Sequence, residues 1–198
     1  MMKSKIKIAE KQDGRRLLEI YAPYVERTAI TFEYVVPTVQ EFEARISHVL
    51  QKYPFLIAKR GEEIMGYAYA SAFKERPAYN WAVETTVYVR HDKKNLGIGG
   101  ELYEALEKVL FAQNILNLNA CIAYPEVEDE YLTQNSIQFH QHLGYRFVGE
   151  FYKCGYKFGR WYNMVWMEKH LSKHTDNPPA VKPFNEIREV IAEKYGIF

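Results

Sequence analysis

The part of this 198-residue chain with the clearest chemistry is residues 87–102, where a β-branched run ends in a basic turn and glycines open a helical pattern. Glycine lets the backbone approach a ligand closely and adopt turns that other residues avoid. The first amides of a helix have no partner within the helix and carry a partial positive charge. Together with Lys93 and Lys94, these amides suit a phosphate or diphosphate group. The segment therefore predicts a binding site for a phosphate-bearing cofactor.

Three kinds of phosphate-binding loop compete for these glycines. A P-loop ends in Gly-Lys followed by Ser or Thr, and the sequence contains no such string. A dinucleotide-binding loop requires a third glycine, but Leu102 stands at that position. The third kind has a basic or amide residue, two further residues, a glycine, one residue and then glycine or alanine. The string Lys94-Asn95-Leu96-Gly97-Ile98-Gly99 fits that form, and a glycine-rich turn without a ligand is the alternative.

Four further motifs occur in order along the chain: Thr31-Phe32-Glu33, Arg76-Pro77-Ala78-Tyr79-Asn80-Trp81-Ala82-Val83-Glu84, Ser136-Ile137-x-x-His140-x-x-Leu143-Gly144-Tyr145 and Gly155-Tyr156-Lys157-Phe158-Gly159-Arg160-Trp161-Tyr162. They resemble the signatures of the phosphinothricin acetyltransferase branch of the GNAT superfamily, over about residues 5–170. The glycine loop resembles that superfamily's acetyl-CoA diphosphate loop, with Lys94 where Arg or Gln is usual.

This resemblance implies a mixed α/β GNAT fold: a central, mostly antiparallel mixed sheet with splayed parallel strands and flanking helices. It also implies transfer of acetyl from acetyl-CoA to the primary amine of a small amino-acid-like compound, such as phosphinothricin or methionine sulfone. The amine would attack directly in a ternary complex. A CoA-binding sensor without catalysis and an acetyltransferase of protein amines are the alternatives.

Two residues are the candidate catalytic groups. Glu84 matches the branch's general base and lies on the strand face opposite the valines of residues 83–89. His140 matches the residue that would protonate the departing sulfur, because imidazole exists in both forms near neutral pH. The alternatives are an ordinary exposed strand carboxylate and a packed, hydrogen-bonded histidine.

The resemblance also implies binding residues. Cofactor contacts are expected from Tyr88, Val89, Lys94, Asn95, Leu96, Gly97, Ile98, Gly99, Gly100, Asn135 and Ser136. The backbone of Tyr88 and Val89 would run along the pantetheine arm, whereas Asn135 stands two residues away from the branch's usual asparagine position. Substrate contacts are expected from Phe32, Glu33, Arg76 and Tyr79. The guanidinium of Arg76 can bind a carboxylate or phosphinate with two hydrogen bonds, and a solvated surface arginine is the alternative.

The composition limits the class of protein. With 47% hydrophobic residues, 26% charged residues and a net charge of +1, the chain is typical of a globular protein and gives no argument for nucleic acid or an anionic membrane as partner. No apolar run approaches 18 residues, and residues 1–7 lack the apolar core of a secretion signal. Two isolated cysteines, Cys121 and Cys154, favour the cytoplasm and have no neighbouring activator for an acyl-enzyme. No set of histidines and carboxylates has metal-ligand spacing, so no metal is expected.

The hydrophobic pattern divides the chain into an acetyltransferase domain over residues 1–171 and a linker with an amphipathic C-terminal helix over residues 172–198. Strands are expected near residues 6–8, 55–58, 64–73, 83–90, 116–123, 145–156 and 160–168, and helices near 12–27, 38–52, 98–110, 134–143 and 184–195. The segment from Tyr156 to Trp161 can close the pocket across the interface of a homodimer. The C-terminal helix is expected to pack on its own domain.

Overall fold

The computed structural model describes residues 3–93 and 95–198, and within them seven strands form one sheet. The strands are β1 (Lys5–Ile8), β2 (Phe55–Arg60), β3 (Glu63–Ala72), β4 (Ala82–Val89), β5 (Asn117–Tyr124), β6 (Arg146–Lys157) and β7 (Arg160–His170). They lie in the order β1-β2-β3-β4-β5-β7-β6. Every pair is antiparallel except β4 and β5, which are parallel. The expected mixed, mostly antiparallel sheet is therefore confirmed.

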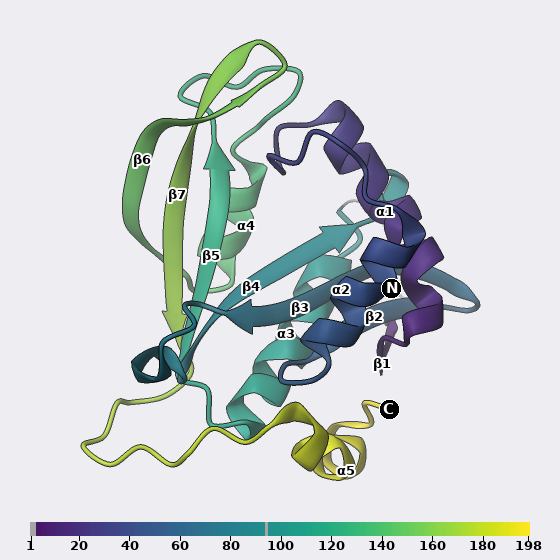
Figure 1. Ribbon diagram of the computed structural model, residues 1–198, viewed down its shortest axis with the longest axis vertical. Helices are drawn as coiled ribbons and strands as arrows, with labels where there is room; N and C mark the ends of the chain where they lie inside the picture. The colour runs from purple at the N-terminus through teal and green to yellow at the C-terminus, as the bar shows by residue number, and fades with distance from the viewer. Residues whose placement is uncertain (1–2, 94) are drawn as a thin grey trace.

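The parallel pair separates soon after it forms. β4 and β5 are paired only from Ala82 opposite Asn117 to Glu84 opposite Asn119. Beyond Glu84 the two strands diverge toward their C-terminal ends (Figure 1). β4 keeps its partner β3 on the other side as far as Val89. The divergence therefore leaves one edge of β4 open in the middle of the sheet.

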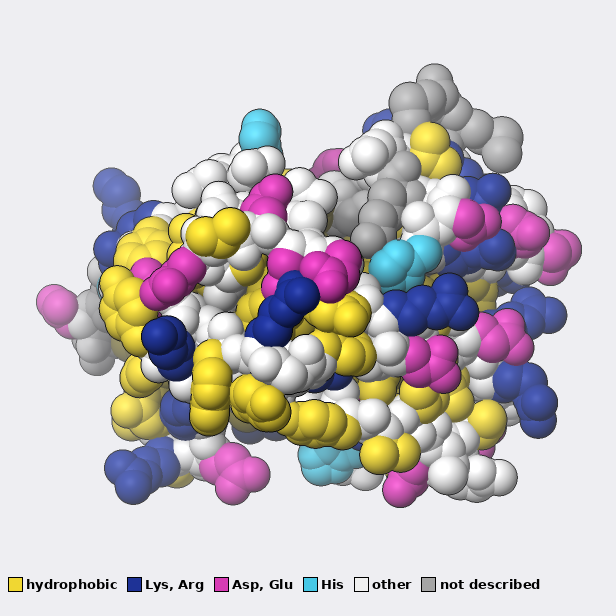
Figure 2. All heavy atoms as spheres, turned by 90° about the horizontal axis from the view of Figure 1, so that it is seen from above, with side chains coloured by type: hydrophobic (Ala, Val, Ile, Leu, Met, Phe, Trp, Pro, Cys, Tyr) yellow, Lys and Arg dark blue, Asp and Glu magenta, His cyan; other side chains and the backbone are white. Residues whose placement is uncertain are grey.

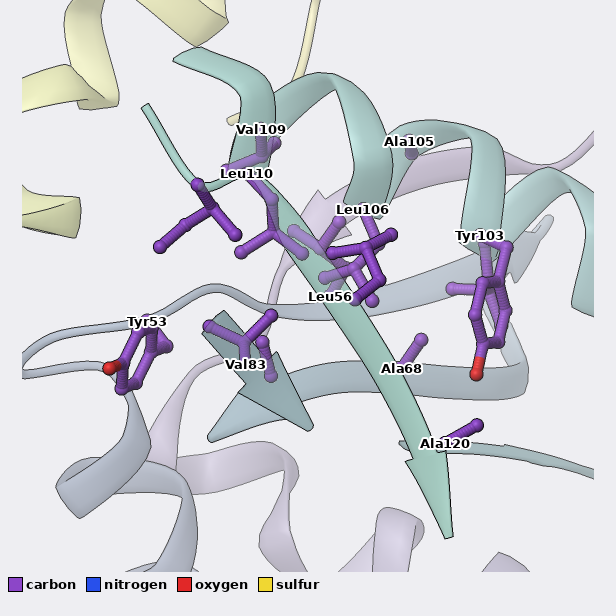
Figure 3. Packing of buried hydrophobic residues seen from close by; sticks show 14 of the residues in the cluster. Tyr53, Leu56, Ala68, Val83, Tyr103, Ala105, Leu106, Val109, Leu110 and Ala120 are labelled. Atoms are coloured by element: carbon purple, nitrogen blue, oxygen red, sulfur yellow. The ribbon is translucent and has the colours of Figure 1, made fainter. Parts of the chain in front are cut away.

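Helices cover both faces of the sheet. α1 (Gly14–Arg27) and α2 (Val39–Val49) lie on one face, and α3 (Ile98–Ala112) lies behind the sheet in Figure 1. α4 (Asn135–His142) follows β5. The apolar stripe of α3 packs on buried strand residues such as Leu56, Ala68 and Val83, and this packing forms the main core (Figure 3). A second core lies between the sheet and the pair α1–α2.

A local sequence signal explains where α2 begins, whereas α1 begins later than expected. At α2, the Thr38 hydroxyl accepts a hydrogen bond from the amide of Glu41, and the Glu41 carboxylate accepts one from the amide of Thr38, which is the expected capping box. The helix expected from residue 12 instead begins at Gly14, after a 3₁₀ turn over Lys11–Asp13.

The C-terminal segment is attached to the same core. α5 (Phe184–Tyr195) buries Phe184, Ile187 and Ile191 in the core that contains α3, so it packs on its own domain as expected. The carbonyl oxygen of Phe198 accepts a hydrogen bond of 2.8 Å from the amide of Ile8 in β1. Across residues 3–93 and 95–198, no helix has both the length and the apolar character that a bilayer crossing requires.

Candidate active site

A cavity of about 540 Å³ opens where β4 and β5 diverge. Its walls come from both faces of the sheet: Phe32 follows α1, Glu84 and Cys121 lie on the strands, and Tyr103 and His140 lie on α3 and α4. Among the described residues that line the cavity, Glu84 is the only carboxylate. Because the strands have separated here, one ligand can contact both faces.

Glu84 occupies the last position at which β4 is still paired with β5. Its neighbours Val83 and Thr85 are buried under α3, so strand alternation directs the Glu84 side chain to the opposite face, as expected. Burial raises the pKa of the Glu84 carboxyl, and the nearby positive charge of Lys74 partly opposes that rise. A carboxylate in this environment binds a proton more tightly than a solvated one, which suits a general base.

Lys74 is a cation near Glu84 that the sequence did not single out. Its ammonium lies 5.1 Å from the ring centroid of Phe73 and 5.9 Å from that of Trp166. Trp166 is paired with Cys121, which lines the cavity. The ammonium therefore stands over aromatic rings beside the cavity, where cation–π attraction favours it.

The four expected substrate residues do not all meet at the cavity. Phe32 lines it, whereas Glu33 forms an ion pair of 2.9 Å with Arg45. Arg76 and Tyr79 lie in the connection between β3 and β4 and are not among the lining residues. The ring of Tyr79 contacts the ring of Phe73 and is 40% exposed. Arg76 and Tyr79 thus stand outside the enclosed space that holds Glu84.

His140 is buried in α4 with both ring nitrogens engaged. Nδ1 lies 2.7 Å from the carbonyl oxygen of Ser136, and Nε2 lies 2.9 Å from the hydroxyl of Tyr103. A carbonyl only accepts, so Nδ1 carries the proton and Nε2 faces the tyrosine. Burial lowers the pKa of His140, although its hydrogen bond to the Ser136 carbonyl works in the opposite direction. The neutral ring is therefore the stable form at neutral pH.

The hydroxyl of Tyr103 connects His140 to strand β4. Figure 3 shows this hydroxyl directed from α3 toward the strands. It lies 3.2 Å from the Thr85 hydroxyl, which also contacts the Tyr145 hydroxyl and the Asn119 carbonyl. The sequence indicates no site role for Tyr103 in α3, Thr85 in β4 or Tyr145 just before β6, since these three segments are far apart in the chain. The one signal in the sequence was Tyr103 itself, a tyrosine with a polar hydroxyl among the apolar residues of α3.

The buried state of His140 predicts a pH dependence of stability. The unfolded histidine titrates near its ordinary pKa of about 6.5, whereas the folded one titrates lower. The unfolded state therefore binds more protons between these values, and the free energy of unfolding should fall as the pH decreases below about 6.5. In urea unfolding between pH 5 and 8, the free energy of unfolding of a His140→Gln variant should fall less with decreasing pH than that of the wild type. Parallel curves for the two proteins would contradict this assignment.

The glycine loop has the geometry of an open helix N-terminus. Gly97 precedes α3 with a φ of +77°, and Asn95 has a φ of +64°. A Cβ placed on Gly97 or on Gly100 would meet nothing within 4 Å, so the space above the first turn of α3 is open. Ile98 and Gly99 begin the helix, and the carbonyl of Leu96 turns away to accept a hydrogen bond from Arg60. Lys94 lies outside the described residues.

The backbone groups of Tyr88 and Val89 face opposite sides of β4. The amide of Arg90 donates to the carbonyl of Met65 in β3, and Tyr88 is paired with Tyr67 of that strand. Backbone groups alternate along a strand, so those of Tyr88 face β3, while those of Val87 and Val89 face the open edge. The backbone of Tyr88 therefore faces β3, while its side chain lines the cavity, and its contact with the cofactor stays a prediction. The open edge offers Val87 beside Val89. The carbonyl of Val89 accepts a hydrogen bond from the Tyr24 hydroxyl.

Two other expected residues, and one cysteine that was not expected at the site, lie in different surroundings. Ser136 lines the cavity, and its carbonyl orients His140. Asn135 is the first residue of α4 and is not among the lining residues. Cys121 lies in the cavity wall, where desolvation and the neighbouring Glu84 raise its thiol pKa to about 12. The thiolate needed for an acyl-enzyme is thus strongly disfavoured.

Comparison with known proteins places this geometry in a family. Residues 6–166 match the model of the acetyltransferase (GNAT) domain. The phosphinothricin N-acetyltransferase of Streptomyces viridochromogenes is 31% identical over 92% of this chain and 95% of its own length. The L-methionine sulfoximine/L-methionine sulfone acetyltransferase of Pseudomonas paraeruginosa is 31% identical over 89% of this chain and 100% of its own.

A solved structure agrees with these sequence matches. The phosphinothricin acetyltransferase of Sinorhizobium meliloti, crystallised with acetyl-CoA, superposes with a TM-score of 0.80 and 28% identity. The match covers 92% of this chain and 99% of that one. The divergent parallel strands, the glycine loop at the start of α3 and these matches lead to one conclusion: the chain belongs to the GNAT acetyltransferase family.

Proposed function

We propose that this acetyltransferase moves acetyl from acetyl-CoA to the primary amine of a small amino-acid-like acceptor. The observation that carries the proposal is the position of Glu84, a half-buried carboxylate with a raised pKa at the point where β4 and β5 separate. The cavity of about 540 Å³ suits a small acceptor better than a protein chain. Relatives named for phosphinothricin and for methionine sulfoximine and sulfone support the acceptor class.

In the proposed mechanism, Glu84 accepts a proton from the acceptor ammonium, directly or through one water, and thereby frees the nitrogen lone pair. Acetyl-CoA supplies the acetyl group as a thioester when it is bound. The amides of Val87 and Val89 face the open edge of β4 and can donate to the acetyl oxygen or to the pantetheine arm. The amine attacks directly, in a ternary complex, without a covalent enzyme intermediate.

His140 acts on the leaving group through Tyr103 in this proposal. The Nε2 atom faces the Tyr103 hydroxyl at 2.9 Å, and both residues line the cavity. The Tyr103 hydroxyl turns its single proton from Nε2 of the neutral imidazole toward the sulfur and stabilises the departing thiolate by a hydrogen bond. The thiolate then takes its proton from solvent. A Tyr103→Phe variant should lower kcat more than the acetyl-CoA KM, and an unchanged kcat would remove the pair from the mechanism.

The remaining binding residues follow from the placement of the loop. We propose that the diphosphate contacts the segment Lys94, Asn95, Leu96, Gly97, Ile98, Gly99 and Gly100 at the N-terminus of α3, with Asn135 and Ser136 nearby on α4. Phe32 forms the acceptor wall. The connection between β3 and β4 carries Lys74, Arg76 and Tyr79 and supplies positive charge for an anionic acceptor group.

We further propose a cytoplasmic homodimer. β6 is an edge strand of the sheet. It exposes the apolar side chains Phe147, Val148, Phe151 and Tyr152. Figure 2, seen from above, shows hydrophobic side chains gathered on the side of the β6–β7 hairpin. Such a patch on an edge strand is suited to a second copy of the chain. A monomer mass in sedimentation equilibrium would reject the dimer.

The proposed location in the cytoplasm rests on the cysteines. Cys121 and Cys154 are free thiols, which fit a reducing compartment.

A thiol-release screen tests the proposed activity. Amino acids, their sulfone and sulfoximine analogues, phosphinothricin and polyamines are each mixed with acetyl-CoA and the purified protein. We expect free CoA to appear with the amino-acid analogues, together with the N-acetylated product by mass spectrometry. CoA binding by calorimetry without thiol release on any amine would favour a sensor. Acetylated peptides without acetylated free amines would favour a protein acceptor.

A further inference from the structure

Lys157 is a buried lysine that the mechanism above does not use. Its side chain is 2% exposed, and its ammonium donates to the carbonyl oxygens of Thr28, at 2.8 Å, and Thr31, at 2.7 Å. Among the described residues, no carboxylate forms an ion pair with it. A buried ammonium without a counter-ion is costly, so its presence at the end of β6 requires a physical explanation.

The end of α1 supplies the negative partner. Thr28 is the C-cap of α1, and carbonyls at a helix C-terminus carry partial negative charge that favours a cation. Burial lowers the pKa of Lys157, and the nearby Glu33 carboxylate opposes that shift. Lys157 therefore caps the C-terminus of α1, although it follows Thr28 by 129 residues in the chain.

Two further contacts join the same segments. The ring of Phe32 lies directly on Gly155, where any Cβ would overlap it. The Tyr34 hydroxyl donates a hydrogen bond to the carbonyl of Tyr156. The loop after α1 is thus fastened to residues 155–157 of β6 by an ammonium, a ring and a hydroxyl.

This fastened loop forms the acceptor side of the cavity. Thr31 and Phe32 both line the space that holds Glu84. We infer that Lys157 is a positioning residue for the acceptor: by holding the carbonyls of Thr28 and Thr31, it keeps Phe32 on Gly155 and so sets the wall against which a small amine is aligned with Glu84. This inference rests on the proposed function, since it assigns a wall of that same site. A wall misplaced by about 1 Å is enough to impair alignment of reacting groups.

Two variants test the wall by independent routes. Lys157→Met removes the charge and keeps the apolar stem, while Gly155→Ala displaces Phe32 and leaves Lys157 in place. We expect each to raise the acceptor KM at least about tenfold and to change the acetyl-CoA KM less than about twofold, because only acceptor binding is lost. Lys169→Met is the matched control, since Lys169 is hydrogen-bonded to Glu107 at 2.7 Å and is not among the cavity-lining residues.

Hydrogen exchange separates positioning from general loss of structure. In Lys157→Met, the amides of residues 28–33 should exchange faster than in the wild type, whereas the amides of α3 should exchange at the wild-type rate. An acceptor KM that stays within about twofold of wild type in both variants would overturn the inference. If Lys157→Met does not fold, Gly155→Ala still tests the Phe32 wall, and an unchanged acceptor KM in that variant overturns the inference. A wild-type protein that acetylates no amine would reject the proposed function, whereas unchanged exchange at residues 28–33 rejects only the role of Lys157.

Discussion

Replacing Glu84 with Gln is expected to lower kcat by about 10²- to 10⁴-fold, the usual contribution of a positioned general base. The amide has nearly the same shape but cannot accept the ammonium proton at working pH. Acetyl-CoA affinity should stay within about twofold, because Glu84 lies on the opposite face from α3 and its glycine loop. Steady-state kinetics with calorimetric titration of acetyl-CoA measures both quantities. Glu62→Gln, on the exposed β2–β3 turn, is the matched control.

The pKa shift of Glu84 gives this prediction a second readout. Because burial raises the pKa of the carboxyl, wild-type activity should begin to fall on acidification at a higher pH than an ordinary carboxyl would give. The charged form is also disfavoured by folding, so the stability that Glu84 contributes is present below its unfolded pKa and is lost as the pH rises through the folded value. Glu84→Gln should therefore unfold at higher urea concentration at pH 7. Full activity of the variant across the pH range would remove Glu84 from the mechanism.

A Gly97→Val substitution is expected to raise the acetyl-CoA KM by about 10- to 100-fold, because it disturbs the loop at the N-terminus of α3. Gly97 has a φ of +77°, and a β-branched residue avoids that region at a cost of about 1–3 kcal/mol. Relief of this strain requires the turn to change, which redirects the first amides of α3. The side chain itself meets open space, so packing does not explain the effect.

The chain offers a closely matched control for this change. Gly61 has a φ of +61°, faces open space and lies in the β2–β3 turn, outside the cavity. Gly61→Val should therefore cost similar stability while leaving both KM values near wild type. Equal acetyl-CoA KM values in Gly97→Val and the wild type would exclude this loop as the diphosphate site.

The sequence predicted the elements that depend on local pattern. The alternation at residues 83–89 and the helical stripe from Ile98 to Leu110 are strong periodic signals, and the observed β4 and α3 agree with them. The divergence of β4 and β5 has no local signal, because it depends on how two distant segments pair. That feature came from the family resemblance, and the register confirms it.

The site was harder to predict where contacts join distant segments. In the sequence, Thr85 is typical of a strand and Tyr103 of a helix. The hydrogen bond between their hydroxyls forms only because α3 packs on β4. Arg76 is expected at the substrate because of its charge and its motif, but its place in the β3–β4 connection, apart from the residues that line the cavity, has no periodic signal in the sequence. Lys157 gave no sign of burial, since lysine is almost always exposed.

The proposed mechanism depends most on where coenzyme A binds. A crystal structure of the protein with CoA measures this directly. The mechanism predicts the diphosphate within hydrogen-bonding distance of amides in residues 95–100, the pantetheine arm along the open edge of β4, and the thiol in the cavity beside Glu84. Coenzyme bound elsewhere, or a loop closed by its own side chains with the thiol far from Glu84, would contradict it.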